Sequence, residues 1–112
     1  MIVEMDIFSG RPNPTWELSP QQTIELQQRV SALHQQVPPS RVFDGLGYRG
    51  LIVRDPSDPG SFLKVGFSRI LYMKDGVESM YDDEGRALEK WLVGTGHGKI
   101  DDRLIAAPVG HL

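Results

Sequence analysis

One dipeptide, Asp75-Gly76, constrains the fold of this chain more than any other local feature. It separates residues 70–74 from residues 77–81, two runs rich in strand-forming residues. Asp-Gly between such runs is typical of a two-residue type I′ turn, which needs positive φ at both central positions. The sequence therefore predicts a β-hairpin here, and with it an antiparallel sheet.

An N-terminal hairpin is also predicted. Apolar and acidic residues alternate over residues 2–8, which is typical of a strand, and residues 15–18 are expected to return beside it. If the connection closes symmetrically, Asp6 lies opposite Glu17, with Glu4 nearby. Like charges opposite each other destabilise a strand pair. We therefore expect either a different register or a cationic side chain among these carboxylates.

Two more strands are expected before the Asp-Gly turn. Residues 48–54 predict one strand, with Leu51 and Val53 on one face and Ile52 on the other. Residues 62–73 predict a second strand, but their alternation changes phase near Gly66. We interpret that change as a bulge or bend within a single strand.

Two helices are predicted from their capping signals. Ser19-Pro20, followed by Gln22, is a capping box with proline at the first helical position, and Pro38-Pro39 is expected to end this helix. Its apolar stripe is Leu26, Val30, Leu33 and Val37. Asp82 or Asp83 is expected to cap the second helix. The expected buried face of that helix is Ala87, Leu88, Trp91 and Leu92.

These elements predict the α+β class: an antiparallel sheet of about five strands, with two helices packed on it, in the order β-β-α-β-β-β-α. The five strands are the N-terminal hairpin and a three-stranded meander. Residues 1–98 are expected to form a single domain. Residues 99–112 show no clear period and are expected to pack on the body or on a partner.

Composition excludes several classes of function. The 112 residues include no cysteine, so disulfides and thiolate metal sites are excluded. Twelve Lys and Arg against 15 Asp and Glu give a net charge of −3, without a basic stripe, so nucleic acid is not an expected partner. No basic leader or membrane-length apolar run is visible, so we expect a cytoplasmic protein without membrane association.

No cofactor and no metal site is predicted. Residues 45–50 spell G-x-G-x-x-G, but a loop precedes them and a strand follows, whereas a dinucleotide site needs a strand and then a helix. Residues 94–99 resemble a P-loop, but the spacing is wrong. His34, His97 and His111 are too far apart in sequence for a metal-binding motif.

The candidate binding site is the loop of residues 9–14, which we name the Arg11 loop. Gly10, Pro12 and Pro14 restrict its backbone, so Arg11 is a preorganised donor for an acidic group. We expect a binding or accessory protein that recognises an acidic or aromatic group on a protein partner or small ligand. The expected contact residues are Arg11, Asn13, Trp16, Tyr48 and Arg49. A plain hairpin connection, with Arg11 stacked on Trp16 or in solvent, is the simpler interpretation.

Two other functions stay open. In a cofactor-independent enzyme, Glu4 or Asp6 would act as acid or base and Arg11 would clamp an anion. The same carboxylates are also compatible with a charged surface neutralised by arginines of neighbouring strands. An acidic immunity-type inhibitor is the third hypothesis, which the net charge of −3 supports only weakly. Homodimerisation is left open.

Overall fold

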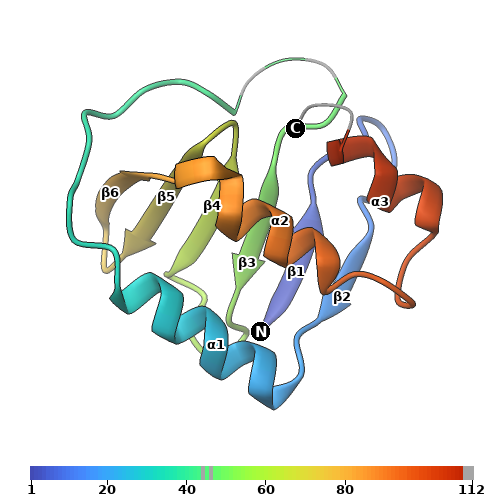
Figure 1. Cartoon of the computed structure of the whole chain (residues 1–112), viewed down its shortest axis with the longest axis horizontal. Coiled ribbons are helices and arrows are strands. Elements are labelled where there is room, and N and C mark those ends of the chain that lie inside the picture. Colours follow the sequence, from blue (N-terminus) through green and yellow to red (C-terminus); the bar gives the residue numbers. More distant parts are fainter. Residues whose placement is uncertain (44, 46, 110–112) are drawn as a thin grey trace.

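The computed structural model describes residues 1–43, 45 and 47–109, with side chains as far as Ile105. Leu46 of the glycine motif and residues 110–112, which include His111, lie outside the described residues. Six antiparallel strands form one sheet in the order β2-β1-β3-β4-β5-β6 (Figure 1). The strands are β1 (Ile2–Met5), β2 (Thr15–Glu17), β3 (Leu51–Arg54), β4 (Phe62–Gly66), β5 (Arg69–Lys74) and β6 (Val77–Asp82). The α+β class with an antiparallel sheet is confirmed.

Helices cover one face of the sheet. In Figure 1, α1 and α2 cross in front of the same sheet face, and α3 lies near the β1–β2 side. Their bounds are α1 (Pro20–Ser31), the 3-10 turn η1 (Glu84–Arg86), α2 (Ala87–Gly94) and α3 (Asp102–Val109). None of the described helices is long and apolar enough to cross a membrane.

The core lies between the helices and the sheet. Alternate strand residues point toward the helices, and they are almost completely removed from solvent. These residues include Val3 and Met5 of β1, Leu51 of β3, Val65 of β4 and Ile70 of β5, and Leu92 of α2 covers them. Their burial leaves polar and charged residues of the same strands on the opposite sheet face.

The N-terminal hairpin does not close symmetrically, and its register differs in the way the like charges led us to expect. Glu17 pairs with Ile2, and Glu4 pairs with Thr15, so Asp6 does not face Glu17. The strand ends at Met5 because the backbone amides that follow it do not continue the hydrogen-bond ladder with β2. The amides of Ile7 and Phe8 donate to the side chain of Asn13 instead. The connection is therefore longer than a symmetric closure requires.

The interpretation of residues 62–73 as one bent strand was also wrong. They form β4 and β5, joined by Phe67 and Ser68, whose φ angles of 53° and 65° are both positive. Neither residue is a glycine or asparagine, the residues that favour positive φ, so the sequence does not mark this turn strongly. The second turn behaves as predicted, with φ angles of 53° at Asp75 and 77° at Gly76. The meander thus has four strands, β3 to β6.

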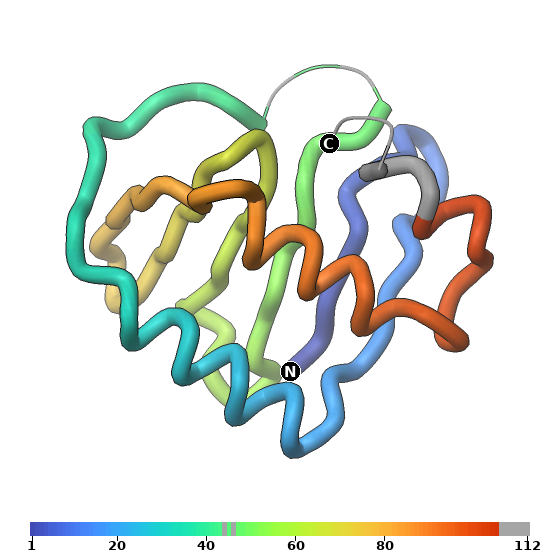
Figure 2. Tube along the Cα trace, in the orientation of Figure 1, coloured from blue at the N-terminus to red at the C-terminus, as the bar shows by residue number. Residues whose placement is uncertain are grey.

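The start of α1 is confirmed, and its predicted end was wrong. Ser19 and Gln22 form the complete capping box. The helix ends at Ser31 and does not reach Pro38-Pro39. The segment that follows α1 runs along the outer side of β6 (Figure 2), where the amide of Val37 donates to the carbonyl of Met80. Hydrogen bonding to the sheet edge replaces the last expected helical turn.

The second helix has a different buried face from the one expected. Asp83, one of the two predicted capping residues, is the N-cap residue of η1, and its carboxylate accepts hydrogen bonds from the first-turn amides of α2 at Leu88 and Glu89, at 2.9 and 3.0 Å. Leu88 and Leu92 are buried, Trp91 is half-buried, and Ala87 is exposed. Ala87 is the first residue of α2, because Arg86 before it has a φ of 55°. Part of the C-terminal segment forms α3, whose Ile105 joins the core.

Candidate functional site

The Arg11 loop is attached to the sheet by the side chain of Asn13. Its Oδ1 accepts hydrogen bonds from the amides of Ile7 and Phe8 at 3.1 and 2.8 Å. Its Nδ2 donates to Glu4 at 2.9 Å and to Asp6 at 3.4 Å. One amide side chain therefore fixes both the start of the loop and the two carboxylates beside it.

Cationic side chains neutralise both carboxylates, as the sequence led us to expect if these acids lay together. Arg54 bonds to Glu4 at 2.9 Å. Arg49 bonds to Asp6 at 2.9 Å, and Lys64 lies 3.5 Å from the other oxygen of Asp6. Burial raises the pKa of Asp6, but the hydrogen bond from Arg49 and the charges of Arg49 and Lys64 outweigh it. The pKa of Asp6 therefore lies below its usual value of 3.8.

Arg49 joins three segments of the chain. Its guanidinium donates to Asp6 and also to the carbonyl of Phe8, the latter at 3.0 Å. Its own amide donates to the carbonyl of Asp6 at 2.7 Å, and the amide of Asp6 donates to the carbonyl of Gly50 at 2.9 Å. These bonds hold the end of β1, the start of the Arg11 loop and the approach to β3 together. Arg49 thus positions the loop.

Arg11 is exposed. Its guanidinium carbon lies 3.7 Å from the ring centroid of Phe8, a cation–π contact with the residue directly before the loop. Among the described residues, none accepts a hydrogen bond from that guanidinium. Stacking on Phe8 limits the orientations of the side chain, while the in-plane N–H donors still face solvent. The stacking partner is therefore Phe8, and Trp16 lies elsewhere.

Trp16 and Tyr48, which we expected near Arg11, are part of the core. Trp16 is 5% exposed and donates from its indole nitrogen to Thr95 at 2.9 Å. Tyr48 is 3% exposed, and its hydroxyl donates to Glu89 at 2.5 Å. Of the predicted binding residues, the structure thus brings Arg11, Asn13 and Arg49 together, beside Glu4 and Asp6.

A buried polar cluster that the sequence analysis missed surrounds Glu89. This side chain is completely buried, and it accepts hydrogen bonds from Tyr48 and from Arg86, the latter at 2.7 Å. Burial and the neighbouring Glu89 raise the pKa of Tyr48. No local signal marks Glu89, because its position between Leu88 and Lys90 reads as the edge of a helix face. The cluster connects α2 to the segment before β3.

The arrangement around Arg11 suits recognition better than acid–base chemistry. Asp6 is paired and stays ionised at neutral pH, so it has no proton to donate. Two hollows of the described surface lie away from it, one between α1 and the sheet and one between the 32–37 segment and η1. Among the described residues, no three His, Asp or Glu side chains are grouped as metal ligands.

No known protein family, curated protein or solved structure matches this chain. The function is therefore inferred from the geometry of the site.

Proposed function

We propose that this protein is a small binding or accessory protein that recognises an acidic group through the Arg11 loop. The main support is the exposed guanidinium of Arg11, stacked on Phe8 in a loop that Asn13 attaches to the sheet. The acidic group would be a carboxylate or phosphate on a protein partner or on a small ligand. A ligand that also has an aromatic ring would suit the site best.

The chemistry of the guanidinium supports an acidic ligand. A planar guanidinium presents N–H donors in a fork that matches the two oxygens of a carboxylate, and such paired hydrogen bonds are among the strongest in proteins. The edge of Arg11 faces solvent, whereas Arg49 is already occupied by Asp6 and Phe8. We therefore assign the ligand contact to Arg11 and a positioning role to Arg49.

The restricted loop also supports binding. A free arginine side chain loses rotamer freedom when it orders against a ligand, and this loss weakens binding. In the Arg11 loop, the ring of Phe8 and the hydrogen bonds of Asn13 reduce that loss before any ligand arrives. An aromatic group can stack on the guanidinium face opposite Phe8 or contact the ring itself, so we expect an aromatic acid to bind better than an aliphatic one.

The two alternative functions gain less support from the geometry. The enzyme hypothesis uses Glu4 or Asp6 as acid or base, and either role is best served by a pKa near the working pH. The pKa of Asp6 is instead lowered, which leaves no proton to donate and makes the carboxylate a weak base, and Glu4 is paired with Arg54. For an acidic inhibitor, an exposed acidic surface would be needed. Glu4 and Asp6 are instead paired with Arg54, Arg49 and Lys64.

The proposal is tested by measuring the affinity of the protein for benzoate, acetate and benzyl alcohol by NMR titration. Benzoate combines a carboxylate with an aromatic ring, and each of the other probes keeps one of these groups. We expect benzoate to bind most tightly of the three probes. Arg11→Ala should lower the affinity for benzoate about tenfold, the loss typical of one charge-assisted contact. Arg41→Ala is the matched control, since Arg41 is also exposed but lies outside the loop. Equal benzoate affinity in wild type and Arg11→Ala would contradict the proposal.

A further inference from the structure

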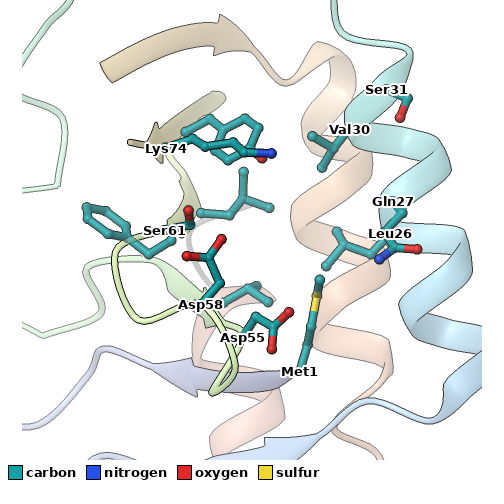
Figure 3. Close-up of a pocket in the computed structure, with 13 residues that line it drawn as sticks. Met1, Leu26, Gln27, Val30, Ser31, Asp55, Asp58, Ser61 and Lys74 are labelled. Atoms are coloured by element: carbon teal, nitrogen blue, oxygen red, sulfur yellow. The ribbon is translucent and has the colours of Figure 1, made fainter. Parts of the chain in front are cut away.

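A second candidate site lies on the helix-covered side of the molecule, in the groove between α1 and the sheet. The groove has a volume of about 320 Å³, and the loop of residues 55–60 closes one end of it (Figure 3). This volume is at the lower end of the range for small-molecule sites. The Arg11 loop contributes no residue to the groove, so the two sites are independent.

The walls of the groove are apolar. Leu26 of α1, Val53 of β3 and Leu63 of β4 line it, and all three are buried. Val30 of α1 and Tyr72 of β5 complete the apolar surface, and both are half-buried. An apolar group of a ligand would therefore lose its contact with water on entering.

Opposite charges lie around this apolar surface. Asp55 and Asp58 belong to the loop at one end, where Met1 with its N-terminal ammonium also lines the groove, and Lys74 is the last residue of β5. Figure 3 shows Lys74 at the opposite end from Asp55, with Leu26 and Val30 across the space from the loop. None of the ion pairs among the described residues includes Asp55, Asp58 or Lys74.

The acidic end of the groove is held in place by local hydrogen bonds. One oxygen of Asp55 accepts from the amide of Ser57 at 2.9 Å and from its hydroxyl at 2.7 Å. These bonds, and to a smaller extent the charge of the N-terminal ammonium of Met1, lower the pKa of Asp55, so its carboxylate stays charged at neutral pH. The loop backbone is closed by a hydrogen bond from the amide of Ser61 to the carbonyl of Asp58 at 3.1 Å.

A buried hydroxyl of the groove lacks a partner. The Oγ atom of Ser61 is removed from solvent and makes no hydrogen bond with any described residue. Buried polar atoms are normally paired, because an unpaired one costs free energy. Ser61 lies on the groove lining between Asp58 and β4.

We propose that this groove binds a compact zwitterion with an apolar body, such as a free aliphatic amino acid. The ammonium group of the ligand faces Asp55 and Asp58, its carboxylate faces Lys74, and its side chain packs on Leu26 and Leu63. A simple anion would meet two carboxylates, and a simple cation would meet Lys74 without a compensating charge. A zwitterion satisfies both ends.

Three probes of the same carbon skeleton test this inference. L-Leucine has both charges, isopentylamine lacks the carboxylate, and 4-methylpentanoate lacks the ammonium group. Binding is followed by NMR titration of the amides of groove residues such as Ser31 and Ser61. We expect L-leucine to bind several-fold more tightly than either single-charge probe. No saturable shift with L-leucine, or an equal affinity for the amine, would overturn the proposal.

Two variants separate the two ends of the ligand. Asp58→Asn is expected to lower the affinity for both L-leucine and isopentylamine about fivefold to tenfold, because each ligand places its ammonium group there. Lys74→Gln is expected to lower the affinity for L-leucine by a similar factor, without lowering the affinity for isopentylamine. Asp75→Asn and Lys90→Gln are the matched controls, as both residues are exposed and do not line the groove. An unchanged L-leucine affinity in Lys74→Gln would overturn the assignment of the carboxylate.

Discussion

The guanidinium of Arg11 lies 3.7 Å from the ring centroid of Phe8, three residues earlier and directly before the Arg11 loop. Phe8 is itself fixed, because its amide donates to Asn13 and its carbonyl accepts from Arg49. The orientation of Arg11 thus depends on a chain of contacts that leads back to the sheet. We regard this chain of contacts as the structural basis of the proposed binding function.

Asn13→Ala should destabilise the protein by about 1–3 kcal/mol, because it leaves two partly buried amides without acceptors. It also removes the donor that Glu4 and Asp6 share. The free energy of unfolding in urea measures this effect. Ser9→Ala is the control in the same loop, since Ser9 is exposed, and it should change stability by less than about 0.5 kcal/mol. Equal stability of the two variants would show that Asn13 does not hold the loop.

Removal of Asp6 should reduce the acid sensitivity of folding. The folded-state pKa of Asp6 lies below its usual value of 3.8, so the carboxylate stabilises the fold above that value. This contribution is lost as the pH falls from about 5 through the lowered folded-state pKa. The wild type should therefore lose more stability over that interval than Asp6→Asn, measured by urea unfolding at each pH. Parallel pH profiles for the two proteins would contradict the assigned pairing with Arg49 and Lys64.

Tyr48→Phe should destabilise the protein by about 1–3 kcal/mol, because it removes a hydroxyl that bonds to the buried carboxylate of Glu89. Tyr81→Phe is a suitable comparison, since that side chain is only half-buried. Thermal and urea unfolding of both variants provide the measurement. A Tyr48→Phe protein as stable as the wild type would mean that Glu89 does not depend on this bond.

Ser68→Gly should stabilise the protein by about 0.5–1 kcal/mol. The φ of Ser68 is 65°, a region that glycine occupies without the strain that a Cβ atom introduces. Ser68→Ala keeps the Cβ atom and should give no such gain. The difference between the two variants in urea unfolding isolates the backbone effect. A gain of equal size in both variants would attribute it to loss of the hydroxyl.

Local signals predicted the parts of the fold that local chemistry determines. The Asp75-Gly76 turn and the capping box of Ser19 and Gln22 need only residues adjacent in sequence. The Phe67-Ser68 turn was missed because its positive φ angles are imposed on residues that do not favour them. The end of α1 was missed because Val37 bonds to β6, which is distant in sequence. Tertiary contacts decided both cases.

The candidate site was only partly predictable for the same reason. The sequence grouped Glu4, Asp6, Arg11 and Asn13, which lie within ten residues of each other. It also placed Trp16 at the surface, although the exposed Thr15 and Glu17 on either side of it put Trp16 on the buried face of β2. The pairing of Arg49 with Asp6 joins residues 43 positions apart, and no local pattern shows such a contact.

The most direct test of the proposed function is the side-chain N–H signal of Arg11 during a benzoate titration. In a spectrum of arginine Nε–H groups, we predict a saturable shift of the Arg11 signal as its fork binds the carboxylate. The signal of Arg41, which is also exposed, should stay in place. An unchanged Arg11 signal at benzoate concentrations that shift other arginines would contradict the account.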